Sequence, residues 1–163
     1  MNDIALIKLR RDVKLNKFVQ IVCLPKTGEG DLAKTKTYGI ATCWEAIKSD
    51  EYGDIPPWSD RHSNRLQYSV YPIQSNPLCS NMSALPFNST VSFCAEVRKA
   101  VDRSCHGDSG GVFIQSAKRG DSSRWVATGV VSCGEGCTHK DQLSFYTRVY
   151  PFIDWITNTV DRK

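Results

Sequence analysis

Short apolar runs separated by turn-forming residues fill most of the chain, which is typical of β-strands. Residues Ile4 to Leu9 alternate as the two faces of a buried strand. Strands or extended segments are also predicted over residues 19–24, 38–47, 66–73, 91–97, 112–115, 125–133 and 144–149, the run from Trp125 to Cys133 being fully buried. Residues 28–36 and the Gly- and Pro-containing stretch 50–65 are predicted to be loops.

One helix is predicted, at the end of the chain. Pro151 stands where the first residue of a helix tolerates proline, and Phe152, Ile156 and Val160 recur every four residues. The fold class is therefore all-β with a C-terminal helix, and the antiparallel strands are expected to form a barrel.

Composition narrows the class of protein. The 163 residues carry 21 Lys and Arg against 17 Asp and Glu, a net charge of +4, with 40% hydrophobic residues. These proportions are those of a globular chain and not of a disordered or collagen-like one, and no apolar run approaches the roughly 20 residues of a membrane span. The positive charge is spread along the chain, so neither a nucleic acid nor a membrane is expected as a partner.

The seven cysteines are dispersed, which favours disulfides over metal ligands and predicts an oxidising, extracellular location. Two sequons, Asn81-Met82-Ser83 and Asn88-Ser89-Thr90, predict glycosylation of Asn81 and Asn88 in a secreted protein. The chain nevertheless opens within a predicted strand and without a signal peptide, and its cysteine count is odd. The interpretation is that an upstream segment is missing.

The strongest chemical signal is the string Gly107-Asp108-Ser109-Gly110-Gly111. Chance would produce it in a chain of this length about once in ten thousand sequences. A nucleophilic hydroxyl has to be exposed on a tight turn, and flanking glycines let the backbone approach a substrate carbonyl. The predicted nucleophile is Ser109, with the backbone N–H groups of Gly107 and Ser109 forming an oxyanion hole.

At these residues the chain resembles the trypsin-like serine proteases of the chymotrypsin fold. The resemblance extends to four further segments in family order: Asn2 to Leu6, Val22 to Pro25, Tyr146 to Val149 and Phe152 to Ile156. It implies that residues 1–163 form part of one protease domain, the C-terminal barrel with a truncated N-terminal barrel. The implied function is serine endopeptidase activity on protein or peptide substrates, open to inhibitors of the same kind and without a cofactor or metal.

The resemblance also assigns roles. Ser109 attacks the substrate, Asp3 orients and charges a histidine, and Asp108 pairs with the new N-terminus made by zymogen cleavage. That histidine belongs well before the aspartate, whereas only two residues precede Asp3. The histidines present, His62, His106 and His139, are poor substitutes because a general base must reach the serine hydroxyl.

The chain alone is therefore predicted to be inactive. One reading is a secreted endopeptidase whose general base lies upstream. The other is a catalytically dead homologue that acts as a secreted binding or regulatory module. The substitutions Arg103, Cys43 and Cys133 favour the second reading, while retention of both Asp3 and Ser109 favours the enzyme.

By resemblance, disulfides join Cys79 to Cys94 and Cys105 to Cys137, and Cys23 tethers an upstream segment of the same precursor. A further family bridge is missing on both sides, where Gly39 and Gln115 stand. The pairing of Cys43 and Cys133 stays open. A zinc site formed by Cys133, Cys137 and His139 is conceivable, but a disulfide or a free thiol is favoured.

Family spacing puts Arg103 at the floor of the specificity pocket, with Ser132, Gly134 and Ser144 in its walls. Arg103 would repel basic substrate side chains and favour acidic ones, or plug the pocket. The Arg103 side chain could also point to solvent, and the pocket would then have no preference among substrate side chains. A slip of one residue would instead bring Asp102 to the floor and restore a preference for Lys or Arg. Primary specificity stays open between these alternatives.

Overall fold

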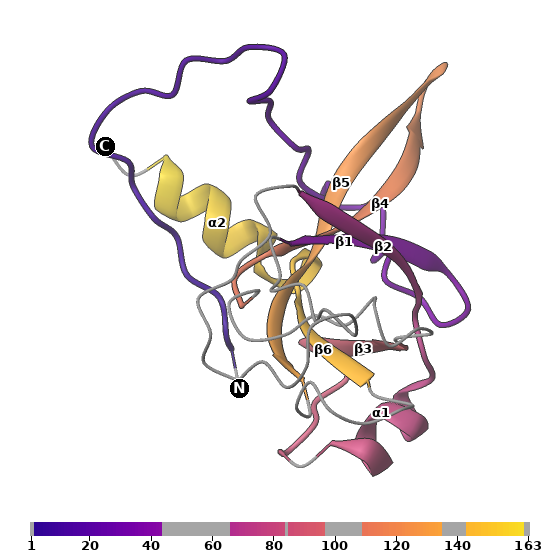
Figure 1. Ribbon diagram of the computed structural model, residues 1–163. Coiled ribbons are helices and arrows are strands. Elements are labelled where there is room, and N and C mark those ends of the chain that lie inside the picture. Colours follow the sequence, from indigo (N-terminus) through magenta and orange to yellow (C-terminus); the bar gives the residue numbers. More distant parts are fainter. Residues whose placement is uncertain (1, 44–65, 84, 97–108, 135–142, 162–163) are drawn as a thin grey trace, which may run out of the picture.

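Six antiparallel strands form a nearly closed barrel in the computed structural model, which describes residues 2–43, 66–83, 85–96, 109–134 and 143–161 (Figure 1). The strands follow the order β2-β1-β4-β5-β6-β3, and a bridge between Ile73 and Ala95 links the two ends of this order. They are β1 (Tyr38–Cys43), β2 (Gln67–Pro72), β3 (Ser92–Glu96), β4 (Val112–Arg119), β5 (Ser122–Gly134) and β6 (Leu143–Arg148). The predicted all-β barrel is confirmed.

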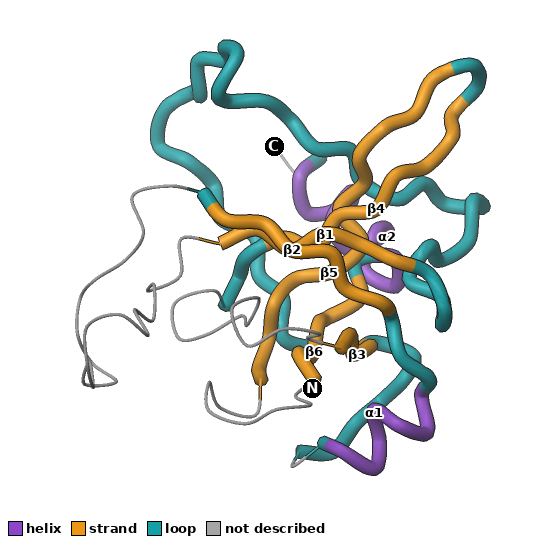
Figure 2. Tube along the Cα trace, turned by 45° about the vertical axis from the view of Figure 1, so that its right-hand side comes forward, coloured by secondary structure: helices purple, strands orange, loops and turns teal. Residues whose placement is uncertain are grey.

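Strands β4 and β5 form a long hairpin that projects from the barrel in both ribbon views (Figures 1 and 2). Its turn is closed by Gly120, whose φ of 64° suits a residue without a Cβ. Strand β5 begins earlier than predicted, and Trp125 is 51% exposed. The prediction of a fully buried run was wrong at this end, because Trp125 lies on the projecting hairpin and keeps about half of its surface exposed.

Three aromatic rings fill the centre of the barrel. Phe93, Phe113 and Tyr146 are all fully buried, and their ring centroids are 4.7 to 5.2 Å apart. The rings come so close to the neighbouring backbone that two positions accept only glycine. A Cβ at Gly39 would lie 2.0 Å from the Phe113 ring, and one at Gly129 would lie 2.7 Å from the Phe93 ring.

Strands β1 and β4 are also joined by a side chain. Gln115 is 5% exposed, and its amide nitrogen donates to the Thr37 hydroxyl and the Tyr38 carbonyl, both at 3.1 Å. The ladder pairs Ile40 with Ile114, so Gly39 faces Gln115 one step further along. The amide therefore links the two strands across the facing positions 39 and 115.

A second helix, α1 (Asn76–Met82), was not predicted. Its N-cap is Ser75, whose side chain accepts from the Leu78 N–H, and Pro77 lies in its first turn, where a missing N–H costs nothing. Cys79 on this helix forms a disulfide with Cys94 in β3, as the resemblance implied. Residues around the sequons therefore belong to a braced helix and loop.

The C-terminal helix is confirmed. A 3₁₀ turn, η1 (Tyr150–Phe152), leads into α2 (Ile153–Val160). Ile153 and Ile156 pack with Val149, whereas Val160, expected on the buried face, is 68% exposed. None of the helices in the described part of the chain has the length and apolar character that a bilayer crossing requires.

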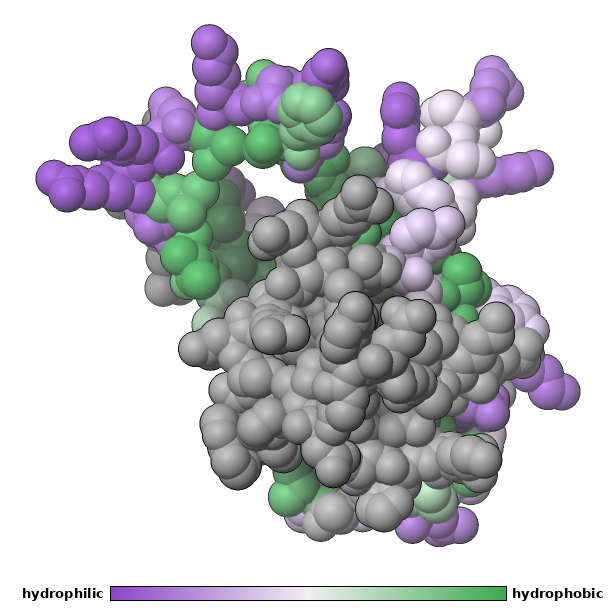
Figure 3. Space-filling model, in the orientation of Figure 1, coloured by the Kyte–Doolittle hydropathy of each residue, from purple (hydrophilic) through white to green (hydrophobic). Residues whose placement is uncertain are grey.

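Residues 2–24 run over the surface in extended or irregular form. The strand predicted from Ile4 to Leu9 was wrong: these residues form no strand, because no described strand lies beside them to share hydrogen bonds. Only Cys23 joins the barrel as a bridge, through backbone bonds to Trp125 and Ala127. Apolar side chains consequently face solvent along this segment (Figure 3), namely Leu6, Ile7, Leu9, Val13, Leu15, Phe18, Val19, Ile21, Val22 and Leu24.

Candidate active site

Ser109 lies on an exposed turn that is fixed to the edge of β5. Gly110 follows it with a φ of 86°, a conformation that favours glycine. The Gly110 N–H donates to the Val131 carbonyl at 2.9 Å, and the Val131 N–H donates to the Gly111 carbonyl at 2.8 Å. These two bonds hold the serine at the surface, as the sequence pattern predicted for a nucleophile.

A β-bulge next to this turn releases Ser132 from the sheet. Val131 pairs with Tyr146 and Cys133 pairs with Phe145, so Ser132 has no partner in the ladder between β5 and β6. An unpaired bulge residue can aim its polar groups at a site instead of at a neighbouring strand.

Ser132 forms one hydrogen bond through its backbone carbonyl and another through its side-chain hydroxyl. The Ser109 hydroxyl donates to the Ser132 carbonyl at 3.4 Å, and the Ser132 hydroxyl donates to Oδ2 of Asp3 at 2.6 Å. The short bond to a carboxylate is of the charge-assisted kind, which is stronger than a bond between neutral groups. The structure therefore brings Asp3 and Ser109, 106 positions apart in the sequence, to one shared neighbour.

Several predicted site residues lie outside the described residues. These are Asp102, Arg103, Cys105, His106, Gly107, Asp108, Cys137, His139 and His62, together with the side chains of Cys43 and Cys133. Gly134 is paired with Ser144 in the ladder between β5 and β6, and Ser144 is 3% exposed. Within the described part of the chain, no group of His, Cys, Asp or Glu is arranged to hold a metal ion.

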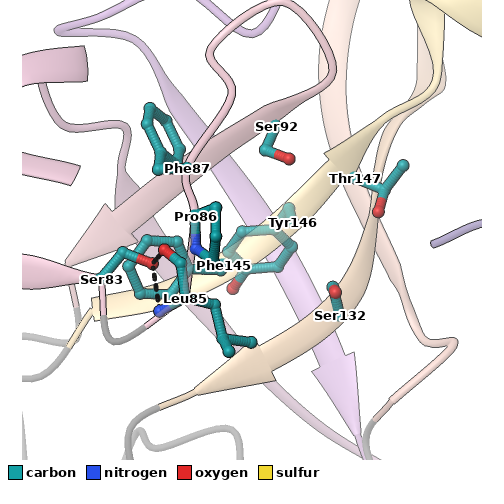
Figure 4. A pocket seen from close by; sticks show the side chains of 9 residues that line it. All are labelled: Ser83, Leu85, Pro86, Phe87, Ser92, Ser132, Phe145, Tyr146 and Thr147. Carbon is teal, nitrogen blue, oxygen red and sulfur yellow. Dashed lines mark hydrogen bonds between the residues drawn. The ribbon is translucent and has the colours of Figure 1, made fainter. Parts of the chain in front are cut away.

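A pocket of about 380 Å³ adjoins this cluster (Figure 4). Ser132 is one of its lining residues, and strand β6 supplies its back wall. The lining consists of Ser83, Leu85, Pro86, Phe87, Ser92, Ser132, Phe145, Tyr146 and Thr147. Of the residues predicted in the specificity walls, only Ser132 lines it.

The opposite wall of this pocket, Leu85 to Phe87, was missed by the sequence analysis. The Phe87 ring meets the Phe145 ring edge to face, with centroids 6.2 Å apart. The available signal was an apolar Leu-Pro-Phe run between two polar sequons, in which Phe87 is partly buried while Leu85 and Pro86 stay exposed. The role of Ser132 beside Asp3 was also missed, because bulges leave no clear pattern in a sequence.

Comparison with known protein families agrees with this geometry. A family model described as Trypsin matches residues 1–156. The chain belongs to the trypsin family. Membership supports a function of the serine-protease type, in a family whose members act on protein substrates, meet protein inhibitors and are typically secreted.

Proposed function

We propose that this trypsin-family chain is the larger part of a secreted serine endopeptidase domain, whose general-base histidine lies on polypeptide upstream of residue 1. The observation that carries the proposal is the path from Asp3 through Ser132 to Ser109. A binding module has no chemical need to hold a carboxylate and an exposed hydroxyl beside one bulged residue. A triad does, because its aspartate and serine approach the histidine from opposite sides.

The reaction would follow the acyl-enzyme route. The Ser109 oxygen attacks the substrate carbonyl while its proton passes to the upstream histidine, which Asp3 orients and stabilises as the cation. The N–H groups of Gly107 and Ser109 would stabilise the oxyanion. The protonated histidine gives its proton to the leaving amine, and water then releases the acyl group by the same steps in reverse order.

The surrounding features complete the proposal. Residues 1–163 would form the C-terminal barrel with part of the N-terminal one, braced by a second disulfide between Cys105 and Cys137. Cys23, which is free among the described cysteines and half-buried, would pair with an upstream segment of the precursor. Asp108 would bind the new N-terminus after activation. Arg103, with Ser132, Gly134 and Ser144, would set the primary specificity.

The second candidate is an inactive homologue that binds a partner in the same cleft. Cys43 and Cys133 stand at positions that this family fills differently near the cleft, and Arg103 departs from a basic-specific pocket. The apolar pocket beside Ser132 would accept a partner's side chain whether or not chemistry follows.

Labelling with a fluorophosphonate separates the two. The probe forms a phosphorus–oxygen bond to an activated serine hydroxyl and releases fluoride, so it reports the nucleophile without any substrate preference. The full-length secreted protein, activated by cleavage, should be labelled at Ser109, and Ser109→Ala should abolish the label. The chain that begins at Met1 should not be labelled, since losing the general base costs roughly six powers of ten in rate. Absence of label on the activated full-length protein would favour the binding module.

A further inference from the structure

One wall of the pocket beside Ser132 is a loop with its own hydrogen bonds. The Ser83 hydroxyl donates to the Leu85 carbonyl at 2.7 Å and accepts from the Leu85 N–H at 3.3 Å, which closes the loop on itself (Figure 4). Phe87 packs against Phe145 of β6 at the other end of the wall. The wall is thus a short apolar loop with an internally hydrogen-bonded turn at one end and an aromatic contact to β6 at the other, and Leu85 and Pro86 are exposed.

The two sequons bracket this wall. Asn81 is exposed in the last turn of α1, two residues before Ser83. Asn88 is exposed and directly follows Phe87. A modification of both asparagines would therefore stand at both ends of the same pocket wall.

Asn88 is also held in a defined orientation. Its side-chain oxygen accepts from the Thr90 N–H at 3.0 Å and from the Thr90 hydroxyl at 2.7 Å. These bonds use only the amide oxygen and not the nitrogen, which is the atom that an N-linked glycan occupies. The turn is anchored in addition by Arg148, whose Nε donates to the Ser89 carbonyl at 2.9 Å.

We infer that N-linked glycans on Asn81 and Asn88 flank the pocket and hinder the approach of large molecules to its wall, while small molecules still reach it. This inference rests on the secretion in the proposed function, not on its chemistry. In the glycosylation reaction, the sugar donor is an oligosaccharide linked to a lipid pyrophosphate. The asparagine nitrogen bonds to the anomeric carbon, the carbon–oxygen bond to the pyrophosphate breaks, and one amide proton is lost. Glycans are bulky and hydrated, so anchoring them at both ends of a short wall narrows the approach.

The test uses accessibility, so it does not depend on activity. The full-length protein is secreted from glycosylating cells as the variant Leu85→Cys, with Pro86→Cys as the second variant if the first is not secreted. Mass spectrometry measures the occupancy of both sequons. The new thiol is then labelled with a small maleimide and with a maleimide carrying a long polyethylene glycol, before and after enzymatic removal of the glycans. Peptide mapping separates this label from any on Cys23.

Removal of the glycans should raise the ratio of the large-probe rate to the small-probe rate at position 85 at least fivefold. The matched control is Ser122→Cys, on the exposed hairpin between β4 and β5, where the ratio should not change. Empty sequons, or an unchanged ratio at position 85, would overturn the inference. Failure of Ser109 to react with a fluorophosphonate would reject the proposed protease and leave this result standing, so the two failures are distinguishable.

Discussion

A buried amide and a position without room for a Cβ define the contact between β1 and β4 at Gln115 and Gly39. The buried amide of Gln115 reaches Thr37 and Tyr38 and so fixes the start of β1 to β4. Gly39, which faces Gln115, has no room for a side chain because the Phe113 ring occupies the space where a Cβ would lie. Any side chain at residue 39 would meet the same ring, so the glycine and the placement of Phe113 belong together.

Substituting Gly39 by alanine tests this packing. The added Cβ, 2.0 Å from Phe113 Cε1, must displace a fully buried ring, and overpacking of this kind costs typically 1–3 kcal/mol. At about 2–4 °C per kcal/mol for a domain of this size, the midpoint of thermal unfolding of the full-length protein should fall by roughly 2–12 °C. Phe113→Leu combined with Gly39→Ala should be more stable than the sum of the two single changes predicts. Strict additivity would mean that the ring is not the obstacle.

Ser132→Ala tests the link between the nucleophile and the carboxylate. Alanine keeps the backbone carbonyl that accepts from Ser109 but removes the hydroxyl that donates to Asp3. A hydrogen bond to a charged group contributes about 1.5–3 kcal/mol, so kcat/KM of the activated protease should fall by roughly 10- to 100-fold, mostly in kcat. Ser122→Ala, on the remote hairpin, is the control and should match the unmodified enzyme. Equal rates for the two variants would remove Ser132 from the mechanism.

At the scale of elements, Arg148 at the end of β6 ties three segments together. Its Nη1 donates to Asp31 at 2.5 Å and to the Ala33 carbonyl at 2.7 Å. Its Nε donates to the carbonyls of Ser89 and Ser92, both at 2.9 Å. A planar guanidinium can serve all four acceptors at once, which a lysine ammonium cannot.

Replacing this arginine should loosen all three segments. Arg148→Leu would leave a carboxylate and three carbonyls without their donor, and losing one partner of a buried pair costs about 3–5 kcal/mol. Asp31 is 25% exposed, so the lower end of that range is expected. Arg148→Lys should recover less than half of the loss, as measured by urea unfolding. Full recovery by lysine would show that charge alone, and not the fork of donors, stabilises the site.

The sequence predicted those elements whose signal is local. Residues 66–73 and 144–149 alternate or run apolar between turn residues, and both became strands. Helix α1 was missed because its seven residues carry too little periodicity, and its proline suggested a break, not a start. The extended segment Ile4 to Leu9 was predicted as a strand because its apolar residues alternate. Such alternation indicates that one face is buried, but it does not identify the segment that covers that face.

The site was predictable only in part for the same reason. The turn at Ser109 was predictable because its motif consists of consecutive residues. The role of Asp3 was inferred from the resemblance to a family. Their meeting at Ser132 depends on a bulge in β5 and on the path of the whole N-terminal segment. Long-range placement of that kind arises from the assembled barrel, so no local pattern encodes it.

At the scale of the whole molecule, the N-terminal segment carries apolar side chains with nothing over them among the described residues. Ile7 is 85% exposed and Leu9 is 60% exposed, although the alternation of residues 4–9 is that of a buried strand. A run of exposed apolar residues on a secreted protein usually marks a surface that another part of the assembly covers. The proposed upstream polypeptide, which would complete the N-terminal barrel, is the occupant expected here.

A charge introduced at this surface distinguishes a covered face from an open one. In the full-length secreted protein, Ile7→Asp should bury a carboxylate without a partner and lower the unfolding free energy by several kcal/mol, with a matching loss of secretion. Lys8→Asp, at the exposed neighbouring position, should change both by little, because surface substitutions usually stay within about 0.5 kcal/mol. If Ile7 stays as exposed in the longer protein as it is here, the two variants will behave alike. In that case the upstream segment does not pack on this face.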